Sequence, residues 1–105
     1  MFRMLVLYPR PDDAEAFDRH YFDVHVPLAT QLDGLRSFTV SRNTTPIRSD
    51  QTYHLVAELD WDSKEAFQAA FASDAGRATG RDAATLAQLC PGMHSVVFEV
   101  EALTP

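Results

Sequence analysis

The sequence predicts an α+β fold in which strands and helices follow the order β-α-β-β-α-β. Short runs rich in β-branched and aromatic residues recur four times along the 105 residues. Two stretches between them carry apolar side chains at helical spacing, and glycine, proline and polar clusters separate the segments. This order is that of the ferredoxin-like arrangement, an antiparallel sheet with two helices on one face. The length suits a single domain over residues 1–105.

The first strand is expected in MFRMLVLY (1–8), which a PRPDD turn ends. The first helix should follow and end at Gly34. Asp12 is its predicted N-cap, because Glu15 three residues later completes a capping box. The apolar residues that recur at helical spacing, and that should form the buried face of this helix, are Phe17, Tyr21, Val24 and Leu28.

The second half of the chain repeats the alternation. Strands are expected in LRSFTVSRN (35–43) and TYHLVAELDW (52–61), joined by a polar loop. A second helix should begin at Asp62, which has Glu65 three residues on. It should continue to residue 89 as a broken or further helix with weak points at Gly76 and Gly80. The last strand is expected in HSVVFEVEAL (94–103).

The first and third strands are apolar on both sides, although helices can cover only one face of this sheet. The uncovered face would be a large exposed apolar patch, which usually marks an interface. The sequence therefore predicts a homodimer that packs through its sheet faces.

The composition excludes some partners and favours one compartment. A formal net charge of −6 argues against nucleic acid and against an anionic membrane surface. Cys90 is the only cysteine, so no internal disulfide can form and a reducing compartment is favoured. The first apolar run is too short for a membrane span and lacks a cleavage site. A cytoplasmic location is the resulting expectation.

His25 is the first candidate for a functional residue. On a helical wheel it lies about 70° from the centre of the apolar sector, at the rim of the buried face. Pro27 cannot donate to the carbonyl of Asp23, so the helix should kink or restart there. The kink would open a gap between helix and sheet, and His25 would line it. The structural alternative is a hydrogen-bonded histidine without a chemical role.

Metal and cofactor sites are not indicated. His20 and His25 are five residues apart, not the four that place two rings on one helix face, and no further ligand cluster is present. There is no GxGxxG and no phosphate-binding loop. Cys90 has no activating partner in the sequence and is expected to be a buried or turn thiol. No bound cofactor is therefore predicted.

The stretch LVLYPRPDDAEAFDRHYFDVHVPLATQLDGLRSFTVS resembles the EthD family signature. Its elements here are Tyr8-Pro9, then Y-x-x-x-H-x-P-L from Tyr21 to Leu28, then Gly34-Leu35. The later helical region resembles the family's helix with a Ser-x-x-Gly break, here Ser73 and Gly76. The resemblance runs nearly end to end.

This resemblance implies a dimeric α+β barrel made of two ferredoxin-like subunits packed by their sheets. The family is named for an accessory protein of ethyl tert-butyl ether degradation, and its members are often classified as oxidoreductases of catabolism. Relatives include isomerases and cyclases that act on aromatic or lactone intermediates without a bound cofactor. The pocket lies between sheet and helices and is lined by the helix histidine, here His25. Some isomerase relatives carry a tyrosine on the second strand, where this chain has Phe38.

The expected ligand is a small, largely apolar metabolite of aromatic, lactone or ether-derived type. His25 would act as acid or base, or as a polar anchor. The candidate walls are Tyr8, Tyr21, Leu28, Phe38 and Tyr53. Because Tyr53 and His54 alternate along a strand, only one of them can face the pocket.

Two classes of function remain open. One is a cofactor-independent acid–base enzyme, and the other is a non-catalytic accessory or carrier protein for a hydrophobic intermediate. A third possibility, haem binding as in distant barrel relatives, would give absorbance in the Soret region. Purified protein is expected to be colourless.

Overall fold

The computed structural model describes residues 1–105 and contains one antiparallel sheet of four strands. The strands are β1 (Phe2–Pro9), β2 (Ser37–Ser41), β3 (Tyr53–Trp61) and β4 (His94–Glu99). Their order in the sheet is β2-β3-β1-β4, and every neighbouring pair is antiparallel. The helical segments are α1 (Ala14–His20), η1 (Tyr21–His25), α2 (Val26–Ala29), α3 (Lys64–Ala72) and α4 (Asp74–Leu89).

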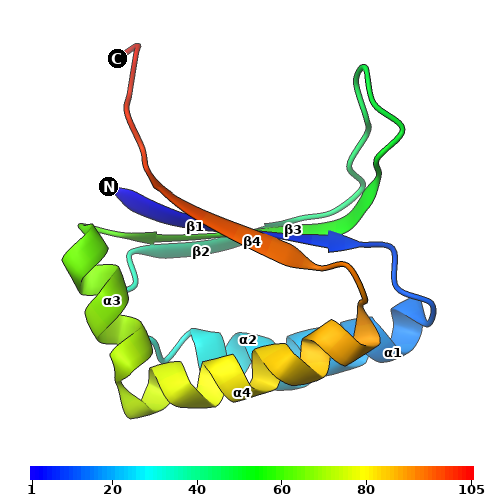
Figure 1. The fold of residues 1–105 in the computed structure, drawn as a ribbon, viewed down its shortest axis with the longest axis horizontal. Coiled ribbons are helices and arrows are strands. Elements are labelled where there is room, and N and C mark those ends of the chain that lie inside the picture. The colour runs from blue at the N-terminus through cyan, green and yellow to red at the C-terminus, as the bar shows by residue number, and fades with distance from the viewer.

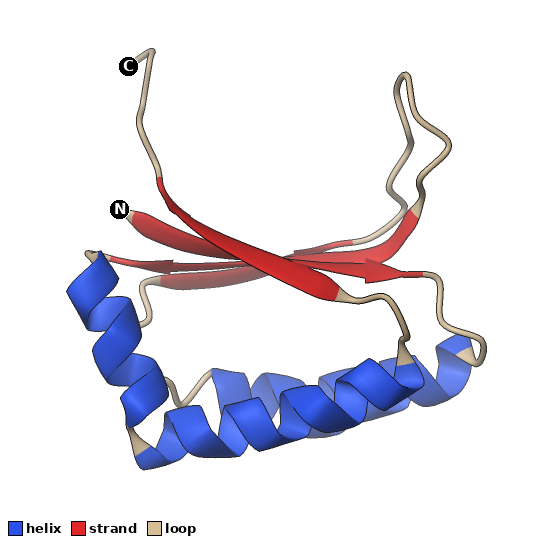
Figure 2. Ribbon diagram, viewed as in Figure 1, coloured by secondary structure: helices blue, strands red, loops and turns tan.

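All helices lie on one face of the sheet (Figures 1 and 2). The loop between β2 and β3 and the C-terminal segment project from the opposite face (Figure 1). The α+β, ferredoxin-like fold class expected from the sequence is therefore confirmed. None of the helices combines the length and the apolar character that a membrane span requires.

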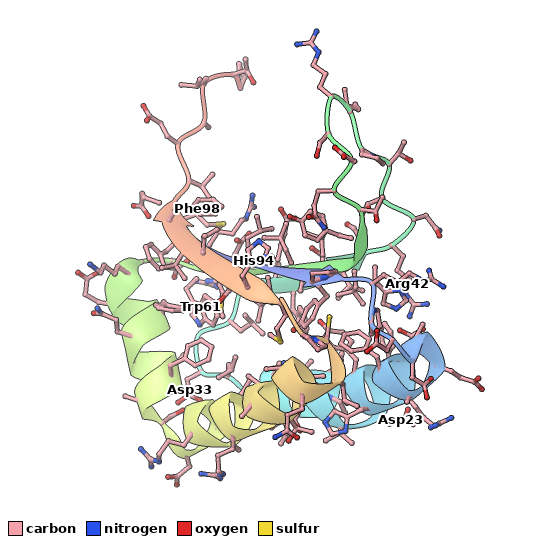
Figure 3. All side chains as sticks on the ribbon, turned by 45° about the vertical axis from the view of Figure 1, so that its right-hand side comes forward. Asp23, Asp33, Arg42, Trp61, His94 and Phe98 are labelled. Carbon is pink, nitrogen blue, oxygen red and sulfur yellow. The ribbon has the colours of Figure 1, made fainter.

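The core lies between the sheet and the helices. Trp61, at the end of β3, is fully buried, and its indole N–H donates to the carbonyl of Asp33 at 3.0 Å. Figure 3 shows the two residues on the helical side of the sheet. A buried Trp needs such a partner for its one polar atom. The apolar residues that share this core are Val6, Tyr8, Phe17, Tyr21, Ala29, Leu32, Leu55, Ala57, Leu59, Ala70, Leu86 and Cys90.

Both helix caps lie one residue later than predicted. Asp13, not Asp12, accepts the backbone N–H three residues on and caps α1. Ser63, not Asp62, caps α3 in the same way, while Asp62 forms a two-point ion pair with Arg36. A cap is fixed by backbone torsions that the order of residue types does not determine, so adjacent polar residues are easily interchanged.

The predicted restart near Pro27 takes the form of a π-turn. The segment Tyr21–His25 has i→i+5 hydrogen bonding, with the N–H of Val26 donating to the carbonyl of Tyr21. A regular α-helix restarts at Val26, with Pro27 in its first turn, where the missing N–H costs little. The helix ends at Ala29, five residues before the predicted end at Gly34, which has φ of +70° in the turn that follows.

The π-turn changes which side chains face the core. The predicted buried face continued through Val24 and Leu28, but Val24 is 41% exposed and Leu28 is only partly buried. His25, Ala29 and Leu32 are buried instead. A wider turn rotates all later residues relative to a regular helix, so the prediction for Val24 and Leu28 was wrong.

The second helical region breaks at Ser73 rather than at a glycine. α3 ends there, and α4 then runs unbroken from Asp74 to Leu89 through Gly76 and Gly80. The hydroxyl of Ser73 accepts the N–H of Gly76 at 3.1 Å and donates to the carbonyl of Ala70 at 2.6 Å. One side chain thus ends one helix and begins the next. The last strand is also shorter than predicted, because β4 ends at Glu99.

Candidate functional site

A cavity of about 100 Å³ lies between the sheet and the helices. Twelve of its sixteen lining residues are apolar. The strands contribute Met4, Val6, Tyr8, Phe38, Ala57, Leu59 and Ser95, and the helices and loops contribute Tyr21, His25, Ala29, Leu32, Phe71, Thr79, Gly80, Ala83 and Met93. An apolar cavity with few polar groups is the usual form of a site for a small apolar molecule.

Four of the six predicted site residues meet at this cavity: Tyr8, Tyr21, His25 and Phe38. Leu28 does not: it is only partly buried and lines no part of the cavity. Tyr53 does not either: its ring lies 6.0 Å from that of His94 near the end of the sheet. A register shift between β1 and β3 at this point interrupts the regular alternation of faces.

His25 is positioned by a stack of aromatic rings on the first helical segment, which consists of α1, η1 and α2 (residues 14–29). Phe17, Tyr21 and His25 are each four residues apart, and consecutive rings are stacked with centroids 5.6 and 5.5 Å apart. In a regular α-helix a spacing of four drifts around the axis, but the π-turn compensates for the drift. The π-turn therefore places His25 on the same buried face as the two aromatic rings before it.

The imidazole of His25 is held by Asp82 of α4. Its Nδ1 lies 2.8 Å from Oδ2 of Asp82, and both side chains are 10% exposed. The other carboxylate oxygen lies 2.7 Å from Nε2 of His20, which is 24% exposed. A carboxylate only accepts hydrogen bonds, so both histidine nitrogens that face it donate. In neutral His25 this leaves the lone pair on Nε2, for which the protein supplies no hydrogen-bond partner.

Burial is the largest influence on the pKa of His25 and lowers it below its ordinary value of 6.5. Hydrogen bonding and charge attraction from Asp82 oppose this shift, and the nearby His20 adds to it. The imidazole is therefore neutral at pH 7, which is the form that can accept a proton. Burial also raises the pKa of Tyr8 and Tyr21, so both phenols stay protonated.

The other titratable groups do not extend this site. No group of three or more His, Cys, Asp or Glu side chains is arranged to hold a metal ion. Cys90 is buried, its thiol lies 3.1 Å from the carbonyl of Pro9, and burial raises its pKa. The thiol is therefore protonated and is a poor nucleophile at neutral pH.

The sequence did not identify Asp82, and it gave His20 no role. Asp82 lies 57 residues from His25, and only the packing of α4 against the first helical segment brings them together. The sequence held one signal, the spacing of Asp82, which follows Thr79 by three residues and precedes Leu86 by four. Thr79 and Leu86 are both buried in the structure. That spacing places a carboxylate beside the apolar stripe of a helix, where an unpaired charge is costly.

Comparison with known proteins agrees with the fold and with the resemblance to the EthD family. The EthD domain family matches residues 10–89. An uncharacterised 11.0 kDa protein from the thcB–thcC intergenic region of Rhodococcus erythropolis is 32% identical over 105 residues, the whole of both chains. An EthD family protein from Bacillus halodurans has a crystal structure with a TM-score of 0.85 and 33% identity, covering 96% of this chain and 99% of that one.

More distant structures share the fold only. SnoaB from Streptomyces nogalater, described as a cofactor-independent oxygenase, has a TM-score of 0.68 and 17% identity, covering 99% of this chain and 96% of that one. Several others are described as dimeric ferredoxin-like proteins. The residues that the family matches, 10–89, make up most of the chain. This chain belongs to the EthD domain family.

Proposed function

We propose that this protein binds a small, largely apolar metabolite in the cavity and that His25 transfers a proton to or from it without a bound cofactor. The observation that carries the proposal is the buried pair of His25 and Asp82. Asp82 holds Nδ1 at 2.8 Å, and the unpaired Nε2 belongs to a ring that lines the apolar cavity. An oriented imidazole with a lowered pKa is suited to accept a proton near neutral pH.

The chemistry that fits best is removal of a proton next to a carbonyl group. As Nε2 of His25 accepts the proton, the ring becomes positive, and the Asp82 carboxylate stabilises that charge. His20 holds the other oxygen of Asp82 and so fixes the carboxylate in place. The protonated phenols of Tyr8 and Tyr21 are candidates to donate to the oxygen that becomes negative in the ligand.

The size and lining of the cavity limit the ligand. An engineered apolar cavity of about 150 Å³ in another protein binds benzene, so the 100 Å³ here suits a compact ring or a short branched group. Aromatic, lactone and ether-derived compounds have such groups. The resemblance to SnoaB, described as a cofactor-independent oxygenase, is consistent with chemistry performed by side chains alone.

A non-catalytic carrier is the second candidate function. It would use the same cavity to shield a hydrophobic intermediate, and His25 would only anchor a polar atom of the ligand. The small number of polar groups in the cavity supports the carrier function. The two functions differ in whether a bound ligand exchanges protons with the protein.

Proton exchange in D₂O separates the two functions without knowledge of the natural substrate. The protein is incubated with small lactones and aromatic ketones, and NMR measures deuterium incorporation next to the carbonyl. We expect His25→Gln to slow the catalysed exchange by at least about 100-fold, since general base catalysis contributes a factor of this order. His94→Gln, at an exposed histidine outside the cavity, should keep the full rate.

The pH profile gives a second check on the same reaction. The rate should fall on acidification, with the step below pH 6.5 because the pKa of His25 is lowered. Binding without any exchange above the buffer rate would leave the carrier function and exclude the acid–base function. Unchanged exchange in His25→Gln would contradict the role given to His25.

We also propose a homodimer that packs through the uncovered face of the sheet. Register places Val96 opposite Leu5 and Phe98 opposite Arg3 on this face, and Val96 and Phe98 are 48% and 37% exposed. Figure 3 shows Phe98 on β4, on the side away from the helices. Dimeric structures of the same fold support the proposal.

Val96→Glu is expected to convert this dimer to a monomer, because it would bury two carboxylates per dimer in an apolar interface. Native mass spectrometry would then show the 11.7 kDa chain alone instead of twice that mass. Val24→Glu is the matched control, since Val24 is similarly exposed but lies on the helical side. A wild-type protein that is monomeric at micromolar concentration would contradict the sheet-to-sheet dimer.

A further inference from the structure

A second cavity, of about 480 Å³, lies at the end of the sheet where β1 ends and β3 begins. It shares no lining residue with the cavity at His25. Arg10 follows β1, Arg42 follows β2, and Tyr53 and His54 begin β3. We propose that this polar groove binds a small anion bearing a carboxylate or phosphate group, and that Arg10 and Arg42 are its principal contacts.

The charges of the groove are the first argument. The chain has 15 acidic residues and nine Lys and Arg. Three of the nine, Arg3, Arg36 and Arg77, pair with a carboxylate. Arg10 and Arg42 have no carboxylate within 4.0 Å, although both line the same groove. Two unpaired guanidinium groups at one concave site favour a negative ligand.

Arg42 is held in place without using its hydrogen-bond donors. Its guanidinium carbon lies 4.2 Å from the ring centroid of Phe22, a cation–π contact that restrains the side chain. Figure 3 shows Arg42 between the base of the projecting loop and the first helical segment. The planar fork of donors remains free, and it matches the geometry of a carboxylate or phosphate.

The one carboxylate of the groove is already paired. Oδ1 of Asp18 lies 2.7 Å from Nε2 of His54, whose ring also packs edge-on against Phe17 at 5.5 Å. Asp18 therefore balances at most one of the two arginines. Arg10, Arg42 and Asp18 together give the groove a formal charge of +1, in a chain whose formal charge is −6.

The loop that forms one wall is fixed to the sheet. The hydroxyl of Thr44 donates to the carbonyl of Tyr53 at 2.7 Å and accepts its N–H at 3.3 Å. Asn43 has φ of +57°, a left-handed conformation that Asn adopts more readily than most residues. The remaining lining groups are polar, and the volume lies within the range of about 300–1,000 Å³ typical of ligand sites.

Calorimetric titration with inorganic phosphate and with succinate, in low-salt buffer, tests this site. We expect at least one of the two anions to bind with a Kd below about 1 mM. Arg10→Gln and Arg42→Gln should each weaken binding at least tenfold, and added KCl should weaken it in the wild-type protein. Arg19→Gln is the matched control, because Arg19 is an exposed arginine of α1 outside the groove.

The two anions distinguish the sources of the negative group, since preference for phosphate or for succinate identifies which chemistry the groove recognises. The proposal is overturned if neither anion binds, or if Arg19→Gln weakens binding as much as the groove variants do. NMR signals of His54 should shift on binding while those of His25 do not. A shift at His25 instead would assign the anion to the apolar cavity and also overturn the proposal.

Discussion

Gly76→Ala is expected to destabilise the protein by about 3 kcal/mol, the upper part of the usual cost of overpacking. A Cβ at Gly76 would lie 2.3 Å from the carbonyl oxygen of Ala70 and 2.4 Å from the Cα of Phe71. Both are backbone atoms, so no side chain can rotate away to relieve the contact. The corner between α3 and α4, which Ser73 joins by two hydrogen bonds, would have to open.

Thermal unfolding followed by circular dichroism measures this effect. A loss of about 3 kcal/mol corresponds to a fall in Tm of more than about 10 °C for a domain of this size. Gly80→Ala is the matched control on the same helix, because a Cβ there meets nothing within 4 Å. It should stabilise by roughly 0.5–1 kcal/mol, since Ala is the better helix former. Equal effects of the two substitutions would show that the corner is looser than described.

Asp82→Asn is expected to lower the pKa of His25 further and to disturb its tautomer. The carboxylate opposes the effect of burial on that pKa, and an amide carries no charge to do so. An amide also has one oxygen and one NH₂ in place of two acceptor oxygens. It cannot accept from His20 and His25 through two separate oxygens, so one imidazole loses its present partner. Catalysed proton exchange should fall by about 10²–10⁴, the range of general acid–base contributions.

NMR spectra of the imidazole nitrogens report both changes directly. In the wild-type protein, Nδ1 of neutral His25 should carry the proton, and in Asp82→Asn this assignment should weaken or reverse. Asp74→Asn is the control, because Asp74 lies at the exposed start of the same helix. An unchanged tautomer and pKa of His25 in Asp82→Asn would contradict the orienting role of Asp82.

The same lowered pKa gives the stability a pH dependence of known sign. In the unfolded chain His25 titrates near 6.5, and in the folded protein it titrates lower. Between these two pKa values the unfolded state binds more protons, so stability falls as the pH drops through this window. Above pH 6.5 His25 contributes no such dependence. Asp82→Asn, which should lower the pKa of His25 in the folded protein further, should extend this pH window to lower pH.

The sheet and the order of elements followed from local patterns in the sequence. Strand runs and helical stripes are set by side chains a few residues apart, and the strong apolar character of β1 and β3 made them easy to find. Which side chains face the core after Tyr21 could not be predicted in the same way. A π-turn breaks the regular period, and the sequence signalled only that Pro27 would disturb the helix.

Only part of the candidate site could be predicted from the sequence. His25 was predicted from its position on the helical wheel and from the resemblance to the EthD family, and Tyr8, Tyr21 and Phe38 were predicted as walls of the implied pocket. All four line the cavity. Asp82 depends on how α4 crosses the first helical segment, which is a property of packing between distant parts of the chain. The polar groove also depends on packing between distant parts of the chain, since Arg10, Arg42 and His54 come from three separate segments.

The burial of Trp61 gives the protein an internal optical reporter. It is the only tryptophan, it has no exposed surface, and its indole is fixed by Asp33 and by contacts with the rings of Phe67 and Phe71. Its fluorescence should therefore be emitted at short wavelength in the folded state and move to longer wavelength when water reaches the ring. Trp61 lines neither cavity. Its emission will consequently follow the loss of the fold.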